Sequence, residues 1–324
     1  MALSFSVCDY LDKRVGAGEG GMSNRTQHGF GISRRRVIAA GLTTAALGGG
    51  QAQWAAAATN FNPDDPASVL RTVFRMRGSE DGRIAMGWLK ARRFGVVDAE
   101  VTPLFGMVTG TFGRYRVLGD GSIVSTSFEL AFYTDLDSGE VLETFTMPYT
   151  GKTITVPRLL LGPSKSTTRP VFHELIKTGY DAERTDSETA MRPVGSTRFE
   201  RWLGPVTVKS SDIWITEASS ATLIPADPTA GKVVYSESVT SKGAYADVIN
   251  PDLVNIPSDL SYTGITSWRP WMQMGDYPGH TTSHGIGGRV FDVDGLPADY
   301  RAMAERYYPA EIADPGAVLA KVGA

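Results

Sequence analysis

The stretch STSFELAFYTDLDSGEVLETFTMP, residues 125–148, alternates apolar and polar side chains on both sides of a turn. Alternation with a period of two is typical of a β-strand that has one buried face. Two such runs joined by a turn at Asp137-Ser138-Gly139 predict a β-hairpin. This stretch therefore favours an antiparallel β-protein.

The first run also separates two kinds of side chain onto opposite faces of its strand. Phe128, Leu130 and Phe132 share one face, and Glu129 and Tyr133 lie on the other. If the three apolar side chains pack under helices outside a barrel, Glu129 and Tyr133 point into its interior. In the opposite arrangement the apolar face is the interior and Glu129 is solvated.

Similar strand-like runs follow one another along most of the chain. They occupy residues 83–95, 112–119, 122–127, 205–219, 232–240, 262–268 and 288–293, with turn residues between them. Short strands at close spacing favour an antiparallel barrel or a closely packed sandwich over a βαβ fold. We expect residues 58–324 to form one mainly β domain.

Two helices are expected at the ends of this domain. Asp65 as N-cap, Pro66 at the first helical position and Gly78 at the end bracket a short helix. Near the C-terminus, Pro297 and Pro309 bracket a second segment with helical periodicity. Because the helical patterns lie at the ends of the strand-rich region, we expect short flanking helices and no doubly wound sheet.

The N-terminal segment ISRRRVIAAGLTTAALGGGQAQWAAAA, residues 32–58, has a basic region, an apolar region and a small-residue end in the order typical of an export signal. Arg34 and Arg35 precede a short, mildly apolar stretch and an alanine-rich end, which resembles a twin-arginine signal. We expect residues 1–57 to be this signal, read by the twin-arginine export machinery, and the protein to be periplasmic or secreted. Met22 as the start would give an n-region of ordinary length. The alternative is a basic tail.

The apolar part of this segment is shorter than the roughly 20 residues that a spanning helix needs, so no stable membrane anchor is expected. Cys8 is the chain's only cysteine, and it precedes the expected cleavage site. The mature protein would therefore contain no cysteine, which excludes thiolate and disulfide chemistry. Without residues 1–57, 26 basic and 32 acidic residues remain, a net charge of −6. An acidic balance argues against a nucleic-acid partner.

The common cofactor and nucleophile motifs do not occur in this sequence. We find no G-x-S-x-G elbow, no phosphate-binding G-x-x-x-x-G-K-[ST] loop and no G-x-G-x-x-G fingerprint after a strand. His173-Glu174 begins like a zinc-protease helix, but Lys177 stands in place of the second histidine. We therefore expect no cofactor.

The stretch SWRPWMQMGDYPGHTTSHGIGGR, residues 267–289, concentrates the candidate functional side chains. On one strand, His280 and His284 would be roughly 13 Å apart, too far to ligate one metal ion, so no metal site is expected. Either histidine suits general acid/base catalysis, with Glu129 as the partner carboxylate. Otherwise both are ordinary surface histidines.

Three side chains at the start of this stretch are candidates for ligand binding. Arg269 between aromatic rings could hold a carboxylate or phenolate, or developing negative charge. Trp268 and Trp271 either line a pocket or close one end of the fold. The neighbouring methionines favour an apolar or aromatic ligand.

Three segments together resemble the DUF1838 family of largely uncharacterised, often exported bacterial and fungal proteins. They are YTDLDSGEVLETFTMPYTGKTITVP (133–157), residues 267–289 and LPADYRAMAERYYP (296–309). The resemblance spans roughly residues 66 to 315, and it implies a β-rich fold similar to the lipocalin or calycin barrel.

The chain departs from the family pattern in two places. The family has a Trp-Asn-Pro-aromatic run before the Thr-Gly turn, where this chain has Phe145-Thr146-Met147-Pro148-Tyr149. It also has a histidine with Asn-Asp-Pro after the turn, where this chain has Arg158 followed by LLLGPS. The departures put the family's site in doubt here, and Tyr149 and Arg158 join the candidate substrate-binding residues.

These observations lead to two functional expectations. The first is an exported, cofactor-independent lyase, isomerase or hydrolase that acts on a small hydrophobic or aromatic molecule by acid/base chemistry. His284 or His280 would be its acid or base. The second is a periplasmic carrier that binds such a molecule without changing it. Convergence of a histidine and a carboxylate in one cavity would distinguish the two.

Overall fold

The computed structural model describes residues 61–178, 194–225 and 232–322. The proposed export signal, with Arg34, Arg35, Met22 and Cys8, lies outside these residues. The described part of the chain is mainly β, as the period-two pattern predicted.

Ten strands form one antiparallel sheet in the order β6-β3-β2-β1-β12-β11-β10-β9-β8-β7. Their bounds are β1 Ala85–Val97, β2 Glu100–Val117, β3 Ile123–Thr134, β6 Leu159–Thr168, β7 His173–Thr178, β8 Val194–Lys209, β9 Asp212–Pro225, β10 Val233–Ala244, β11 Ser258–Thr266 and β12 His280–Val290. A separate pair consists of β4 (Thr144–Thr146) and β5 (Thr153–Thr155).

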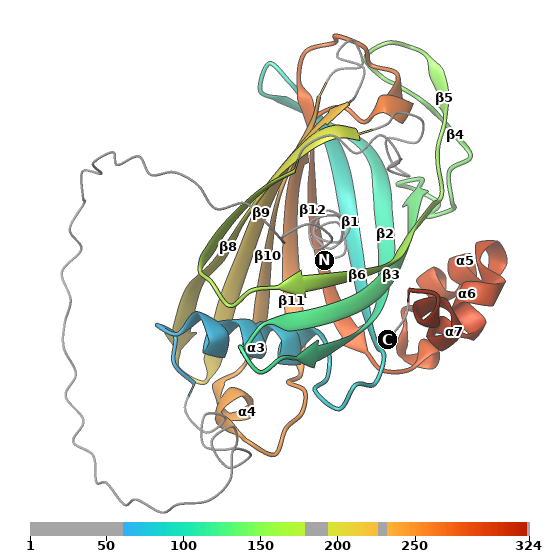
Figure 1. Ribbon diagram of the computed structural model, residues 1–324. Helices are drawn as coiled ribbons and strands as arrows, with labels where there is room; N and C mark the ends of the chain where they lie inside the picture. Colours follow the sequence, from blue (N-terminus) through green and yellow to red (C-terminus); the bar gives the residue numbers. More distant parts are fainter. Residues whose placement is uncertain (1–60, 179–193, 226–231, 323–324) are drawn as a thin grey trace, which may run out of the picture.

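The sheet is strongly curled but is not closed into a barrel. Figure 1 shows β3 and β6 passing in front of strands β9 to β12. The edge strands β6 and β7 are not paired with each other. Pro163 lies within β6 and Pro170 precedes β7. Because proline has no N–H to donate to a ladder, Pro163 suits an edge strand and Pro170 weakens pairing next to it.

Short helices flank the sheet at both ends of the chain, as expected from the sequence. Helix α3 (Pro66–Arg77) has Asp65 as N-cap, accepting from the N–H groups of Ala67 and Ser68, and ends at Gly78. The other helices are α4 (Tyr245–Ile249), α5 (Ala298–Tyr307), α6 (Pro309–Ala313), α7 (Pro315–Ala320) and the 3-10 turns η3 (Pro270–Met272) and η4 (Val293–Gly295).

The curl creates an inner face with two distinct ends. Helix α3 lies across one end, here called the α3 end, and the β4–β5 pair lies beyond the other (Figure 1). Leu70 and Phe74 of α3 share a buried cluster with Tyr115 of β2 and with Ile213 and Ile215 of β9. Since β2 and β9 are far apart in the strand order, the helix fills the space between the two halves of the curled sheet.

The opposite end, here called the aromatic end, holds a second buried cluster. Its members include Phe105, Tyr133, Met147 and Met272, with Trp271 packed against them. They come from β2, β3, the β4 segment and η3, so the β4–β5 pair and the turn after β11 cover this end of the inner face.

A third buried cluster occupies the outer face of the sheet. Phe128, Leu130 and Phe132 of β3 pack there with Tyr300 and Leu319 of the C-terminal helices. The apolar face of β3 is therefore the outer one. Of the two arrangements that the sequence left open, the structure has the one in which Glu129 and Tyr133 point inward, and both side chains are buried on the face opposite the helices.

The predicted hairpin over residues 125–148 forms only at its turn. Gly139 donates its N–H to the carbonyl of Asp135, and a single bridge joins Thr134 to Val141. Residues 144–146 pair with residues 153–155 instead. The second run of the predicted hairpin does not join the main sheet, because β3 pairs with β6 on that side.

The glycines near the end of β12 allow its backbone to approach β1 closely. A Cβ at Gly287 would lie 2.1 Å from the carbonyl oxygen of Trp88, and one at Gly285 would lie 2.6 Å from that of Lys90. No real Cβ contact is that short, so the curl at this point depends on glycine. Gly285 and Gly287 are thus required by the fold.

Candidate functional site in the curled sheet

A row of residues paired across seven strands places four buried charged side chains on the inner face. The row, here called the inner row, runs from β1 to β7 through Arg93, Ser283, Gly264, Glu237, Ser219, Arg201 and Glu174. Its four charged side chains are buried, with Arg93 1 % and Glu237 3 % exposed. Buried charges are costly unless they are paired or hydrogen-bonded, so such a row marks a candidate site.

Arg93 is the most deeply buried member of the inner row. Its Nε donates to Ser283 Oγ at 3.0 Å, and Nη2 lies 3.6 Å from the sulfur of Met107. The guanidinium carbon lies 5.7 Å from the centre of the Tyr133 ring. Among the described residues, Nη1 of Arg93 has no hydrogen-bond partner. This N–H group can donate to an acceptor that the described residues do not supply.

Aromatic rings surround the same region of the aromatic end. The Trp271 ring lies 5.0 Å from that of Tyr133 and 5.7 Å from that of Phe105, between ring centres. Trp271 Nε1 is buried and makes no hydrogen bond within the described part of the chain. Arg93 and Trp271 thus both lie against Tyr133, and each has one N–H for which the described residues supply no acceptor.

Three of the predicted binding residues lie in the two segments that cover this end. The Trp268 ring packs edge-on against Tyr149, at 5.4 Å between centres, and its Nε1 donates to Pro278 O. Arg269 is buried and stacks on Tyr235, with its guanidinium carbon 5.5 Å from the ring centre. The structure therefore places Trp268, Arg269 and Tyr149 at the aromatic end together with Trp271.

Arg158 lies elsewhere. It pairs with Glu143 at 2.6 Å and stacks over the Tyr307 ring of α5, 4.5 Å from its centre. Because α5 packs on the outer face, Arg158 does not join the other predicted binding residues.

The two candidate catalytic histidines both lie on β12 and face outward. His284 is exposed and is paired with the exposed Arg92, and its ring lies 6.2 Å from that of Phe94. His280, four residues before it, has the same orientation by alternation. Glu129 lies on the inner face, 3 % exposed and paired with Thr111. The structure does not bring either histidine together with Glu129.

A buried network of ion pairs was not anticipated from the sequence. Arg77 Nη1 lies 3.0 Å from Glu217 Oε1, and Glu217 Oε2 lies 3.7 Å from Arg201 Nη1. Arg201 continues to Glu174 at 3.3 Å, and Glu174 pairs with the exposed Arg169 at 2.6 Å. The network links α3 to β9, β8 and β7 and ends at the open edge of the sheet.

Glu217 is the carboxylate at the centre of this network. Burial opposes its charged form, but the neighbouring charges of Arg77 and Arg201 outweigh burial and hold its pKa below the usual value of a glutamate. Glu217 is therefore an anion in the folded protein at neutral pH.

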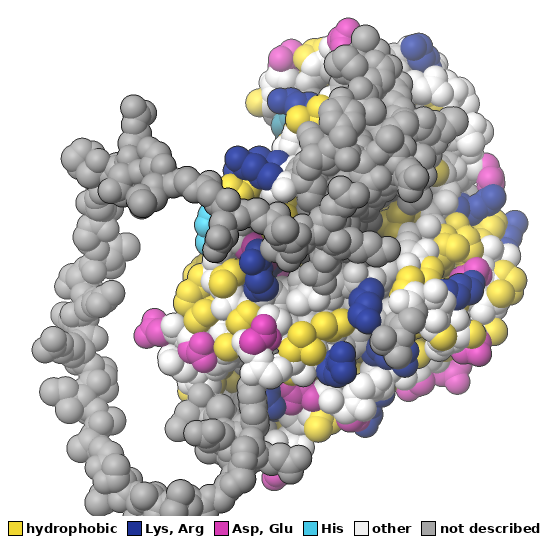
Figure 2. All heavy atoms as spheres, viewed as in Figure 1, with side chains coloured by type: hydrophobic (Ala, Val, Ile, Leu, Met, Phe, Trp, Pro, Cys, Tyr) yellow, Lys and Arg dark blue, Asp and Glu magenta, His cyan; other side chains and the backbone are white. Residues whose placement is uncertain are grey.

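The described surface carries both signs of charge. Figure 2 shows Lys and Arg side chains interspersed with Asp and Glu on the face that it presents. None of the described helices has the length and apolar content to span a membrane. In the described ranges, no group of three or more His, Cys, Asp or Glu residues is arranged to hold a metal ion.

Comparison with known proteins gives one family match. Residues 235–316 match the model of DUF1838, "Protein of unknown function". This range contains residues 267–289 and 296–309, so the match confirms the resemblance that these segments suggested. No curated protein matches.

The solved structures with some similarity are distant from this chain. A multiple mutant of Rh. blastica porin is 8 % identical, with 64 % of this chain and 100 % of that chain covered and a TM-score of 0.22. Aeromonas veronii immune modulator A is 10 % identical, with 67 % and 99 % covered and a TM-score of 0.10.

Proposed function

We propose that this DUF1838 protein is a carrier that binds a small molecule with an aromatic or apolar body and an acidic group inside the curled sheet. In this proposal the sheet acts as an incompletely closed barrel of the lipocalin type. The observation that carries the proposal is the guanidinium of Arg93, buried beside Tyr133 with Nη1 lacking a partner among the described residues.

We infer the acidic group of the ligand from the protein atoms that lack hydrogen-bond partners. Arg93 Nη1 and Trp271 Nε1 are both donors, and neither finds an acceptor within the described ranges. A buried donor without an acceptor costs free energy, which a carboxylate or phenolate oxygen would recover. The aromatic body follows from the rings of Phe105, Tyr133 and Trp271, which offer apolar contact area.

The positions of the histidines favour a carrier over an acid/base enzyme. A general base must come within hydrogen-bond reach of the proton it takes. His280 and His284 face outward from β12, whereas the aromatic rings of the proposed site lie on the inner face. An enzyme acting on the same kind of molecule would have to use Glu129 or another inner carboxylate.

Export by the twin-arginine machinery remains part of the proposal. A version with Arg34→Lys and Arg35→Lys is expected to stay in the cytoplasm, because the export receptor reads the arginine pair. Cell fractionation against the unchanged chain measures this, and equal export of both versions would contradict it.

The ligand proposal is tested by replacing Arg93 with methionine. Removing a buried charge whose Nη1 has no hydrogen-bond partner in the described part of the chain is expected to leave the melting temperature unchanged or higher. The affinity for 2-naphthoate is expected to fall about tenfold or more, and that for neutral 2-naphthamide to change little. Titration calorimetry with both compounds measures the difference.

Arg92→Gln is the matched control, because Arg92 is the exposed neighbour of Arg93 on the same strand. Small molecules extracted from the purified proteins provide a second readout. An acidic compound should accompany the wild-type and Arg92→Gln proteins and be lost from Arg93→Met. If no acid is extracted and naphthoate binds no better than naphthamide, the carrier proposal fails.

A further inference from the structure

The inner row continues from Arg93 across three neighbouring strands. Arg93 is paired with Ser283 of β12, Ser283 with Gly264 of β11, and Gly264 with Glu237 of β10. Residues directly opposite each other on one face of an antiparallel pair have Cβ atoms about 4.5–5.5 Å apart. The four positions therefore lie side by side on the inner face, next to the proposed ligand site.

The hydroxyl of Tyr262 fills the space above Gly264 in this row. A Cβ at Gly264 would lie 2.3 Å from the Tyr262 hydroxyl oxygen and 2.9 Å from the ring carbon that bears it. Only glycine leaves room for a hydroxyl there. Tyr262 is 3 % exposed. Its hydroxyl is therefore held on the inner face between the positions of Ser283 and Glu237.

The charges at the two ends of this part of the row are opposite and well separated. Three strand spacings, roughly 14 Å along the sheet, lie between the backbones of Arg93 and Glu237. The guanidinium of Arg93 lies against Ser283 Oγ and the Met107 sulfur. Because Met107 is on β2, on the far side of β1 from β10, the arginine is not directed at Glu237. A molecule lying between the two residues could contact both.

The Glu237 end of this row suits a hydroxyl group on a ligand. A carboxylate has two oxygens and about four acceptor sites, so Glu237 can accept a hydrogen bond from a ligand in addition to its contacts within the protein. Hydrogen bonds to an ionised acceptor are about twice as strong as neutral ones. The Tyr262 hydroxyl both donates and accepts. A ligand hydroxyl can donate to Glu237 and accept from Tyr262, whereas an ammonium group could only donate.

We propose that the molecule carried in the curled sheet is a hydroxy acid, with its carboxylate on Arg93 and its hydroxyl, at the opposite end of an aromatic body, on Glu237 and Tyr262. The body would cross Ser283, whose side chain is small and fully buried. This assignment rests on the proposed carrier function, and it adds the second polar group of the ligand and the residues that select that group.

Three compounds that differ at one position test the second polar group. 2-Naphthoate carries only the carboxylate, 6-hydroxy-2-naphthoate adds a hydroxyl at the opposite end, and 6-methoxy-2-naphthoate keeps that oxygen without its proton. In titration calorimetry, the hydroxy compound is expected to have a dissociation constant about tenfold or more below that of 2-naphthoate. The methoxy compound should have no such advantage, because it cannot donate to Glu237.

Glu237→Gln is the informative variant, because glutamine keeps the shape of the side chain and removes the charged acceptor. It is expected to bind the hydroxy compound and 2-naphthoate about equally, with the affinity for 2-naphthoate close to that of the wild type. Tyr262→Phe is a second, milder variant that keeps the ring over Gly264. Its preference for the hydroxy compound should be reduced severalfold, so the test does not depend on how well Glu237→Gln folds.

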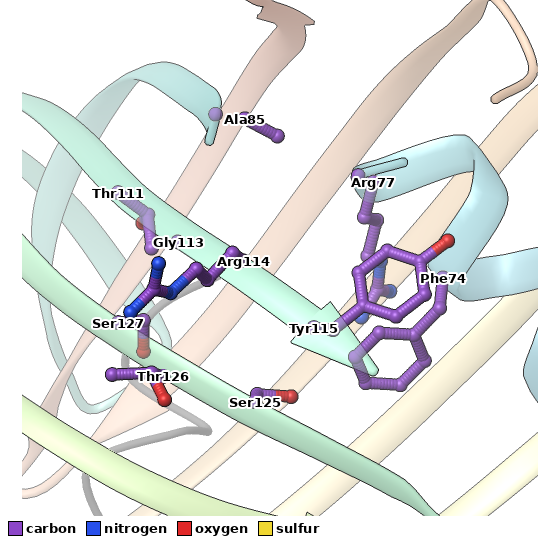
Figure 3. A pocket seen from close by; sticks show the side chains of 12 residues that line it. Phe74, Arg77, Ala85, Thr111, Gly113, Arg114, Tyr115, Ser125, Thr126 and Ser127 are labelled. Carbon is purple, nitrogen blue, oxygen red and sulfur yellow. The ribbon is translucent and has the colours of Figure 1, made fainter. Parts of the chain in front are cut away.

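Tyr115→Phe is the matched control for Tyr262→Phe. Figure 3 shows the Tyr115 ring beside Phe74 at the α3 end, and Tyr115 is 7 % exposed. Tyr115 is ten positions beyond Phe105 on β2, roughly 33 Å along the strand from the residue paired with Arg93. The preference for the hydroxy compound should therefore keep its wild-type value in Tyr115→Phe. In Arg93→Met both compounds should bind more weakly, with their ratio unchanged.

Equal affinity of the wild type for 2-naphthoate and 6-hydroxy-2-naphthoate would overturn the hydroxy-acid assignment, and so would a Glu237→Gln protein that keeps the full preference. In both cases the carrier proposal would stand, provided that 2-naphthoate still binds better than 2-naphthamide. An acid without a hydroxyl group, extracted from the purified protein, would also overturn the assignment. Binding of none of the three naphthoates would instead refute the carrier proposal together with this assignment.

Discussion

Replacing Glu217 with alanine is expected to lower the free energy of unfolding by about 3–5 kcal/mol, because breaking a buried ion pair leaves a charge without compensation. Arg77 and Arg201 both depend on this carboxylate, at 3.0 Å and 3.7 Å. The network also joins α3 to the half of the sheet that ends at β7. Urea unfolding followed by circular dichroism measures the change.

An exposed ion pair provides the control for this prediction. Glu143 pairs with Arg158 at 2.6 Å, and their side chains are 64 % and 37 % exposed. Because exposed pairs contribute about 0–1 kcal/mol, Glu143→Ala should have a small effect. Equal losses in the two variants would show that the buried network does not stabilise the fold.

The same carboxylate predicts the direction of a pH effect. The pKa of Glu217 is lower in the folded protein than its usual value. Its contribution to stability is therefore complete above the unfolded pKa, about 4.3, and is lost as the pH falls through the folded value. The stability difference between wild type and Glu217→Ala should narrow in acid.

Replacing Phe105 with alanine is expected to cost about 3–5 kcal/mol, the range for removing a buried aromatic ring. Phe105 is 0 % exposed. Its ring lies 5.0 Å from that of Tyr133 and 5.3 Å from that of Phe145, between centres. Its loss would open a void between β2 and the segments that cover the aromatic end.

The loss is measured by chemical denaturation. A lower midpoint with an unchanged m-value, the slope of the unfolding free energy against denaturant concentration, would identify it as a change in stability. Val101→Ala is the control, because Val101 is on the same strand but 59 % exposed. It should alter stability by no more than about 0.5 kcal/mol. A Phe105→Ala protein as stable as Val101→Ala would contradict the role of Phe105 in holding the aromatic end together.

The local parts of the fold could be predicted from the sequence because short-range chemistry decides them. Asp65, Pro66 and Gly78 bracket α3 as capping rules require. The alternation of Phe128, Glu129 and Leu130 fixes which side chains share a face. These features depend on a few adjacent residues.

The pairing of strands was less predictable. The run that follows Gly139 alternates well enough for a hairpin, yet its residues 144–146 pair with 153–155. Leu142 and Phe145 pack against the cluster at the aromatic end. Burial of these side chains over that end, which no local pattern encodes, competes with extension of the hairpin.

The buried charged residues of the inner face could have been predicted from the sequence, but they were not. Arg92 and Arg93 are adjacent on a strand, so one of them must face inward. Similarly, Glu237 alternates in phase with Tyr235 and Val239, which are buried. A charged residue in phase with buried apolar residues indicates a buried charge, and this observation would have predicted Arg93 and Glu237.

By itself, the sequence determined a mainly β chain with capped helices at its ends, a set of aromatic and basic side chains in residues 267–289, and two faces for each strand. Only the tertiary structure decided which face of each strand is the inner one. It placed His284 outside and Arg93 inside, and it joined Arg77 to Glu217 across 140 positions of the chain. The reason is physical: alternation specifies two faces equally well, and only the curl of the sheet around α3 determines which of them lines the interior.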